Sequence, residues 1–132
     1  MPGPTTFELA SFPNTRNKVS NATQRAIPLR IVIPASGALG TPGTPVKLLD
    51  YNASRTYFKI INLNLVNTAN YDFAPLGHEG TPPADLATDG VPVYQQAGYD
   101  DQPSPQELWA VNMCDNNGAQ DIIIMIEEGS SE

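Results

Sequence analysis

The sequence predicts an all-β fold: a single, jelly-roll-like β-sandwich of about seven to eight strands over residues 26–132, preceded by an extended arm over residues 1–25. Thirteen prolines and ten glycines interrupt the 132 residues at short intervals, and such residues form turns or end regular structure. The runs between them are short and rich in Val, Ile, Tyr and Phe, which is typical of strands. Helical signals are almost absent, and the length suffices for one domain with its own core.

Residues 1–25 show no apolar periodicity, and we expect them to form an extended N-terminal arm. Three prolines interrupt the segment, and Ser, Thr and Asn dominate it. Such a segment can become ordered when it lies along a partner. The candidate partner-binding residues combine apolar anchors with positive charges: Phe7, Leu9, Phe12, Arg16, Lys18 and Arg25. The alternative is that the segment adds a strand to the sheet edge of its own domain.

The first strong strand is expected at 26–34 (AIPLRIVIP), where alternate residues are apolar. Pro28 and Pro34 favour a sheet edge, because proline has no N–H to donate to a strand ladder. Further strands are expected at 46–50, 55–66, 71–74 and 91–96. The segments between them are rich in turn residues, and the longest is the insertion at 75–90.

The segment 107–128 (ELWAVNMCDNNGAQDIIIMIEE) is predicted to form a two-stranded hairpin, because Asn117-Gly118 is a strong tight-turn signal. Both faces of both strands are apolar, whereas a strand with one face in water alternates apolar and polar residues. The hairpin is therefore expected to be covered twice, by its own core and by another subunit. Which face is core and which is interface stays open. The expected interface residues are Trp109, Val111, Met113, Ile123 and Met125.

Charge is distributed unevenly along the chain. All seven basic residues precede residue 60, twelve acids follow Lys59, and the formal net charge is −7. A basic arm can lie on the acidic body of its own or a neighbouring chain, or it can reach an acidic partner surface. An acidic body repels phosphates, so nucleic acid is not an expected partner. No membrane contact is expected either, because no apolar run is long enough to span a bilayer and residues 1–12 do not read as a secretory signal.

No catalytic, cofactor-binding or metal-binding residues are expected. The single cysteine, Cys114, lies in an apolar strand, where cysteine usually behaves as a small hydrophobe. The single histidine, His78, lies in a Pro/Gly-rich loop, and no nucleophile-elbow motif accompanies it. Four aspartates lie in two loops: Asp85, Asp89, Asp100 and Asp101. Their spacing is not that of an EF-hand calcium loop.

The order of segments from Ser54 to Gly129 resembles a pattern found in small β-sandwich structural proteins of tailed bacteriophage virions. The segments that carry the resemblance are SRTYFKIIN (54–62), YDFAPLG (71–77), DGVPVYQQAGYD (89–100), ELWAVNM (107–113) and DIIIMIEEG (121–129). Together they cover a little over half of the chain. The longer insertion at 77–89 and the N-terminal arm depart from the pattern.

The resemblance implies a non-enzymatic virion protein: a capsid decoration (cement) protein, or the base of a head fibre or spike. The implied partners are the major capsid protein, which the arm would bind, and copies of the chain itself, with a homotrimer expected. The implied location is the capsid exterior, after synthesis in the host cytoplasm. Two alternatives stay open: a tail or spike component, and a carbohydrate- or receptor-binding module that uses the loops at 77–90 and 98–105.

Overall fold

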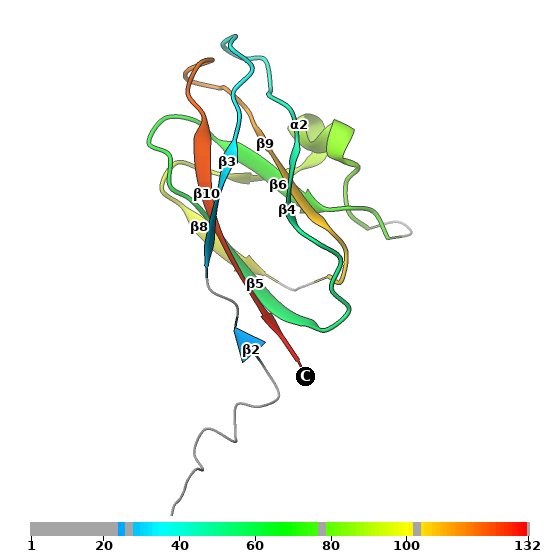
Figure 1. The fold of residues 1–132 in the computed structure, drawn as a ribbon. Coiled ribbons are helices and arrows are strands. Elements are labelled where there is room, and N and C mark those ends of the chain that lie inside the picture. Colours follow the sequence, from blue (N-terminus) through cyan, green and yellow to red (C-terminus); the bar gives the residue numbers. More distant parts are fainter. Residues whose placement is uncertain (1–23, 26–27, 77–78, 102–103, 132) are drawn as a thin grey trace, which may run out of the picture.

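The chain forms two antiparallel β-sheets that pack face to face, with short helical turns beside them (Figure 1). The computed structural model describes residues 24–25, 28–76, 79–101 and 104–131. The five-stranded sheet contains β2 (Gln24–Arg25), β3 (Leu29–Ile33), β5 (Arg55–Asn62), β8 (Gly98–Asp101) and β10 (Ile122–Ser130). The four-stranded sheet contains β4 (Val46–Leu49), β6 (Ala69–Phe73), β7 (Val91–Val93) and β9 (Leu108–Asn112). The helical turns are η2 (Pro83–Asp85) and α2 (Leu86–Asp89).

The strand order is that of a jelly roll. One sheet runs β3-β10-β5-β8 and the other β4-β9-β6-β7, so most successive strands lie in opposite sheets. Two interleaved sheets of this kind define the jelly-roll arrangement. β2 lengthens an edge of the first sheet, because it pairs with β10 beyond the stretch that pairs with β3. The predicted all-β, jelly-roll-like sandwich is confirmed, and so is the edge position of the first strong strand.

Asparagine side chains end β5 earlier than the sequence predicts. The expected strand covers 55–66, whereas β5 ends at Asn62. The side-chain oxygen of Asn62 accepts a hydrogen bond from Asn64 N (2.8 Å), and that of Asn64 accepts one from Val66 N (2.7 Å). Local side-chain bonds of this kind compete with the strand ladder and turn the chain. Residues 64–66 therefore leave the sheet.

The predicted terminal hairpin is wrong, because β9 and β10 lie in opposite sheets. Residues 113–121 cross from one sheet to the other, and the buried Asn67 holds this crossing. Its side-chain amide donates to the carbonyl oxygens of Asn117 (2.8 Å) and Gln120 (2.9 Å). Gly118 packs closely on the backbone of residues 38–39. The Asn-Gly signal does mark a turn, but this turn forms a corner of the sandwich.

The core lies between the inner faces of the two sheets. Phe58 is fully buried there and makes edge-to-face ring contacts with Tyr71 (centroids 6.1 Å apart) and Phe73 (5.1 Å). The buried apolar cluster comprises Ile33, Leu48, Leu49, Phe58, Ile60, Ala69, Tyr71, Val93, Leu108, Ala110, Ile122, Ile124 and Ile126. Because strand residues alternate between faces, the odd-numbered residues of β10 point away from this core.

The second cover of β9 comes from the chain itself. Val111 is only 2% exposed although it lies outside the main core cluster. α2 lies against β6 and β9 (Figure 1), and its Leu86 is fully buried. The Asn70 side chain donates to the Leu86 carbonyl oxygen (3.0 Å) and fastens the helix to the sheet. α2, which lies within the 75–90 insertion, thus packs on the four-stranded sheet beside Val111, where the sequence predicts another subunit.

Candidate interaction surface

No metal-binding cluster is present among the residues that the structure describes: no three His, Cys, Asp or Glu side chains there could hold a metal ion together. Over the same residues, none of the helices has the length and apolar character needed to cross a bilayer. Cys114 is fully buried, and its sulfur accepts a hydrogen bond from Ser36 N (3.4 Å). Asp100 and Asp101 belong to strand β8, so their predicted loop position is wrong. Their side chains and His78 lie outside the described part, so the chemical expectations about them stay predictions.

The five predicted interface residues do not form one surface. Trp109, Val111 and Met113 belong to β9 or follow it directly, whereas Ile123 and Met125 belong to β10 in the opposite sheet. Val111 is buried inside the chain, and the half-buried Trp109 donates its indole N–H to the Glu107 carboxylate (3.1 Å). Ile123 and Met125 are the members that lie on an accessible apolar surface, the outer face of the five-stranded sheet.

Six apolar side chains gather on this outer face and are exposed or half-buried. We name them the apolar face: Val32, Ile61, Leu63, Leu65, Ile123 and Met125. Strand register places Val32 beside Ile123 and Ile61 beside Met125. Leu63 N donates to the Ile123 carbonyl oxygen (2.9 Å), which brings the end of β5 to the same place. Ile123 is 43% exposed and Leu65 70% exposed, so water contacts a continuous apolar strip.

A hollow of about 340 Å³ opens at one end of the apolar face, between residues 63–66 and 120–123. The Asn turns after β5 shape one wall. The other wall is held by the Asn64 side chain, which donates to the Asp121 carbonyl oxygen (2.9 Å). The side chain of Asp121 is exposed at the rim. The sequence analysis did not identify Leu63 and Leu65 as surface residues, because it placed both in a strand. The Asn-Leu-Asn order at 62–64 could have indicated the turn, since both asparagine side chains bond to the backbone there.

Both signs of charge flank the opposite end of the apolar face. Strand register places Arg30 beside Met125 and Lys59 beside Glu127. The Tyr57 hydroxyl donates to the Glu127 carboxylate (2.6 Å). The hollow end therefore carries a carboxylate, Asp121, while the far end carries mixed charges.

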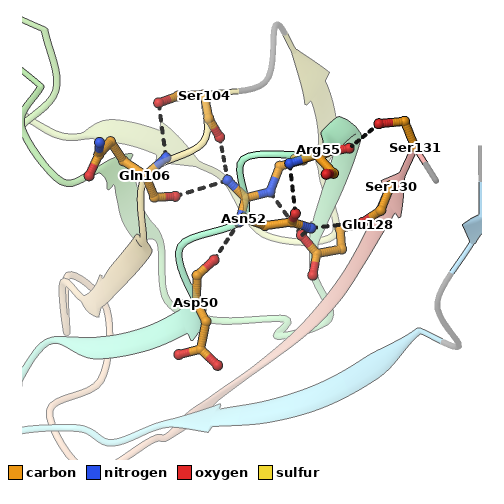
Figure 2. A network of polar contacts seen from close by, with 9 residues as sticks. Asp50, Asn52, Arg55, Ser104, Gln106, Glu128, Ser130 and Ser131 are labelled. Atoms are coloured by element: carbon orange, nitrogen blue, oxygen red, sulfur yellow. Dashed lines mark hydrogen bonds and ion pairs between the residues drawn. The ribbon is translucent and has the colours of Figure 1, made fainter.

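A buried arginine clasps the end of the sandwich at which β2 joins β10. Figure 2 shows the Arg55 guanidinium surrounded by acceptors from three segments. Arg55 Nε donates to Glu128 Oε2 (2.8 Å), and Arg55 Nη2 donates to the Asp50 carbonyl oxygen (2.7 Å). Arg55 Nη1 donates to the carbonyl oxygens of Ser104 and Gln106. The arginine side chain is 0% exposed, so its charge depends on Glu128 for neutralisation.

Further hydrogen bonds connect the last residues of β10 to the same network (Figure 2). We call this network, centred on Arg55, Asn52 and Glu128, the clasp. The Asn52 side chain donates to Ser130 Oγ (2.7 Å) and to Glu128 Oε2 (3.3 Å), and Ser131 N donates to the Ser54 carbonyl oxygen (2.7 Å). The contacts of this network join residues 50–55 and 104–106 to the end of β10. We therefore assign the network a structural role: it holds the end of β10 to which β2 is paired.

Of the predicted arm, the structure describes the last two residues, Gln24 and Arg25. Gln24 pairs with Ser130 and Arg25 with Gly129, so these two residues extend the edge of their own sheet. Of the side chains proposed to bind a partner, that of Arg25 lies outside the described part, as do the following residues: Phe7, Leu9, Phe12, Arg16 and Lys18.

A second hollow, of about 250 Å³, lies where two loops meet. Its lining includes Ser104 from one loop, Asp72 and Phe73 from β6, and these residues of the other loop: Ala74, Leu76, Glu79 and Gly80. Both oxygens of Asp72 already accept hydrogen bonds, one from Phe73 N (2.7 Å) and one from Thr81 Oγ1 (2.8 Å). The site thus combines an aromatic ring with bonded and exposed carboxylates, the latter from Glu79.

The sequence matches no protein-family model and no curated protein. Among solved structures, the chain is similar to one from Bacillus endospore appendages, described as a novel family of disulfide-linked pili. The TM-score is 0.46 at 10% identity, and the match covers 95% of this chain and 98% of that one. A TM-score at this level carries no argument about function.

Proposed function

We propose that this chain is a non-enzymatic structural protein that decorates the head of a tailed bacteriophage as a homo-oligomer, with a trimer as the expected state. The observation that carries the proposal is the apolar face, an apolar strip with a hollow on the outside of a closed sandwich. Contiguous exposed apolar surface on a soluble domain usually marks a contact with another protein. Ile123 and Met125, which the sequence predicts as interface residues, lie in this strip.

The resemblance to small virion proteins supports the capsid as the larger partner. A jelly roll alone would not, because the same fold occurs in capsid proteins, lectins and enzymes. The proposed partner is the major capsid protein, and the proposed location is the capsid exterior. The arm can meet either the capsid protein or another copy of this chain, and head binding by itself does not separate these two contacts.

Two measurements test the proposal. Light scattering of the purified chain at micromolar concentration is expected to give the mass of an oligomer. Co-sedimentation with undecorated heads is expected to show saturable binding, while heads already carrying their decoration protein serve as the control and take up little. A monomer that does not sediment with undecorated heads contradicts the proposal.

The hollow between the two loops favours a carbohydrate-binding module as the second candidate. It brings together the loops at 77–90 and 98–105, through residues 79–80 and Ser104, and it offers an aromatic ring and carboxylates, groups that bind sugar faces and hydroxyls. A glycan array distinguishes the two candidates. Glycan binding that Glu79→Gln abolishes, together with no binding to heads, would replace the first proposal by the second.

A further inference from the structure

The apolar face needs an occupant that brings apolar side chains and a positive charge to it. Its hollow is lined by Leu63, Leu65 and Ile123, with the exposed Asp121 carboxylate at the rim. An extended segment with a few apolar anchors fits such a strip better than a flat protein surface does, because single side chains can enter the hollow.

Residues 1–23 have this chemistry. Their apolar anchors are Phe7, Leu9, Phe12 and Val19, and their basic residues Arg16 and Lys18 outnumber the single acid, Glu8. The rest of the chain is strongly acidic. Opposite charges on the segment and on the rim of the hollow would orient the contact, while the anchors would supply most of its strength.

The pairing of β2 sets the direction in which this segment leaves the sandwich. Gln24 pairs with Ser130 and Arg25 with Gly129, so a straight continuation of this strand toward residue 23 would pass beyond the C-terminal end of β10. Ile123 lies at the other end of β10, seven residues back and about 23 Å away. To reach the apolar face of its own chain the segment would have to reverse this direction, and a contact with another copy requires no such reversal.

The length of the segment is sufficient for this contact. An extended stretch of residues 1–23 spans up to about 75 Å, several times the distance along β10. The clasp of Arg55, Asn52 and Glu128 holds the end of β10 to which β2 is paired. The root of the segment, β2, is therefore held at this end of β10.

We propose that residues 1–23 of one copy cover the apolar face of a neighbouring copy, with an aromatic or aliphatic side chain seated in the hollow. This inference rests on the proposed self-association and names the contact that produces it. The contact is head-to-tail, because the root of the arm and the hollow lie at opposite ends of β10. Head-to-tail contacts close into a ring, such as a trimer, or continue as an open chain, depending on the rotation between copies.

Cysteine cross-linking between two differently tagged, co-expressed full-length chains tests the contact. One chain carries Phe7→Cys, Leu9→Cys or Phe12→Cys, and the other carries Leu65→Cys. Mild oxidation is expected to link the two tagged chains for at least one of the three positions. The matched control replaces Leu65→Cys by Val91→Cys, a site on the opposite sheet that is also exposed (42%), and no link is expected there.

A second variant tests whether the contact holds the oligomer together. Ile123→Lys changes a residue that is 43% exposed and Val91→Lys one that is 42% exposed, so both should fold, which circular dichroism checks. Ile123→Lys is expected to reduce the mass in light scattering to that of a monomer, and Val91→Lys to leave it unchanged.

The outcomes separate this inference from the proposed function. An oligomer that shows no link at any of the three positions and survives Ile123→Lys overturns the inference and leaves self-association standing. A link within single chains, and none between them, also overturns it, because the arm then covers its own chain. If deleting residues 1–20 preserves the oligomer but abolishes head binding, the arm belongs to the capsid contact instead. A monomeric wild-type chain contradicts the proposed self-association itself.

Discussion

The substitution Glu128→Gln tests the clasp because it removes one charge while keeping the side-chain shape. Glu128 is the carboxylate paired with Arg55, at 2.8 Å from Nε. The arginine side chain is 0% exposed and that of Glu128 22% exposed. After the substitution, the guanidinium charge stays buried without a counter-charge. It keeps its carbonyl acceptors from Asp50, Ser104 and Gln106.

The expected loss of stability follows from this geometry. Removing one partner of a buried ion pair costs about 3–5 kcal/mol, because an uncompensated charge remains inside. The remaining carbonyl acceptors and the partial exposure of Glu128 place the loss at the lower end, about 3 kcal/mol. For a chain of this size that corresponds to a fall in Tm of roughly 12 °C. With a slope of about 2 kcal/mol/M, the urea midpoint falls by about 1.5 M.

Urea denaturation followed by circular dichroism measures this loss, and Asp50→Asn is the matched control. This substitution also replaces a charged carboxylate by a neutral amide. The ion pair that it removes, between Asp50 and Lys47 (2.8 Å), has both side chains exposed to solvent. Exposed pairs contribute little, so the control is expected to change the midpoint only slightly. A shift for Glu128→Gln no larger than that of the control would refute the assignment of Arg55–Glu128 as a buried, stabilising pair.

The control also has a defined pH dependence. The hydrogen bond and the charge of Lys47 lower the pKa of the Asp50 carboxyl below its ordinary value of 3.8. A group with a lowered folded-state pKa contributes stability above its unfolded pKa and loses that contribution as the pH falls through the folded pKa. Any difference between wild type and Asp50→Asn is therefore present at pH 7 and disappears as the pH falls below 3.8 through the lowered pKa.

Three further changes test other parts of the structure. Gly118→Ala places a Cβ against the backbone of Ala38 and Leu39 and is expected to cost about 2 kcal/mol by overpacking; an unchanged urea midpoint would contradict the close packing of this corner. Cys114 is fully buried, so a thiol reagent is expected to label it only in denatured protein, and rapid labelling of the native chain would contradict its placement. Deleting residues 1–20 is expected to leave a sandwich that still melts cooperatively, since the core cluster runs from Ile33 to Ile126; loss of cooperative melting would show that the arm is part of the fold.

The strands of the first sheet edge illustrate what local patterns can predict. Proline at 28 and 34 marked the edge position of β3, and alternating apolar residues marked the strand itself. These signals depend on properties of single residues, such as the missing N–H of proline and the alternation of side chains along a strand. They hold whichever strand becomes the neighbour.

The candidate surface was predictable only in part. An excess of apolar residues on both faces of β10 pointed to Ile123 and Met125, and these do lie on the apolar face. The same reasoning selected Val111, which α2 of the same chain covers. Apolar character marks residues whose burial is favourable, and it does not show which segment covers them.

The sequence by itself determined the fold class, the edge strand and the apolar character of both faces of β9 and β10, because these follow from residue type and spacing. The tertiary structure decided that β9 and β10 lie in opposite sheets and that their outer faces point apart. It also decided that Leu63 and Leu65 leave the strand and line the same hollow as Ile123. The physical reason is that strand pairing depends on contacts between residues far apart in the chain, such as those of Asn67 with residues 116–120. Such contacts form only when the whole sandwich is assembled, and no local window of sequence contains both partners.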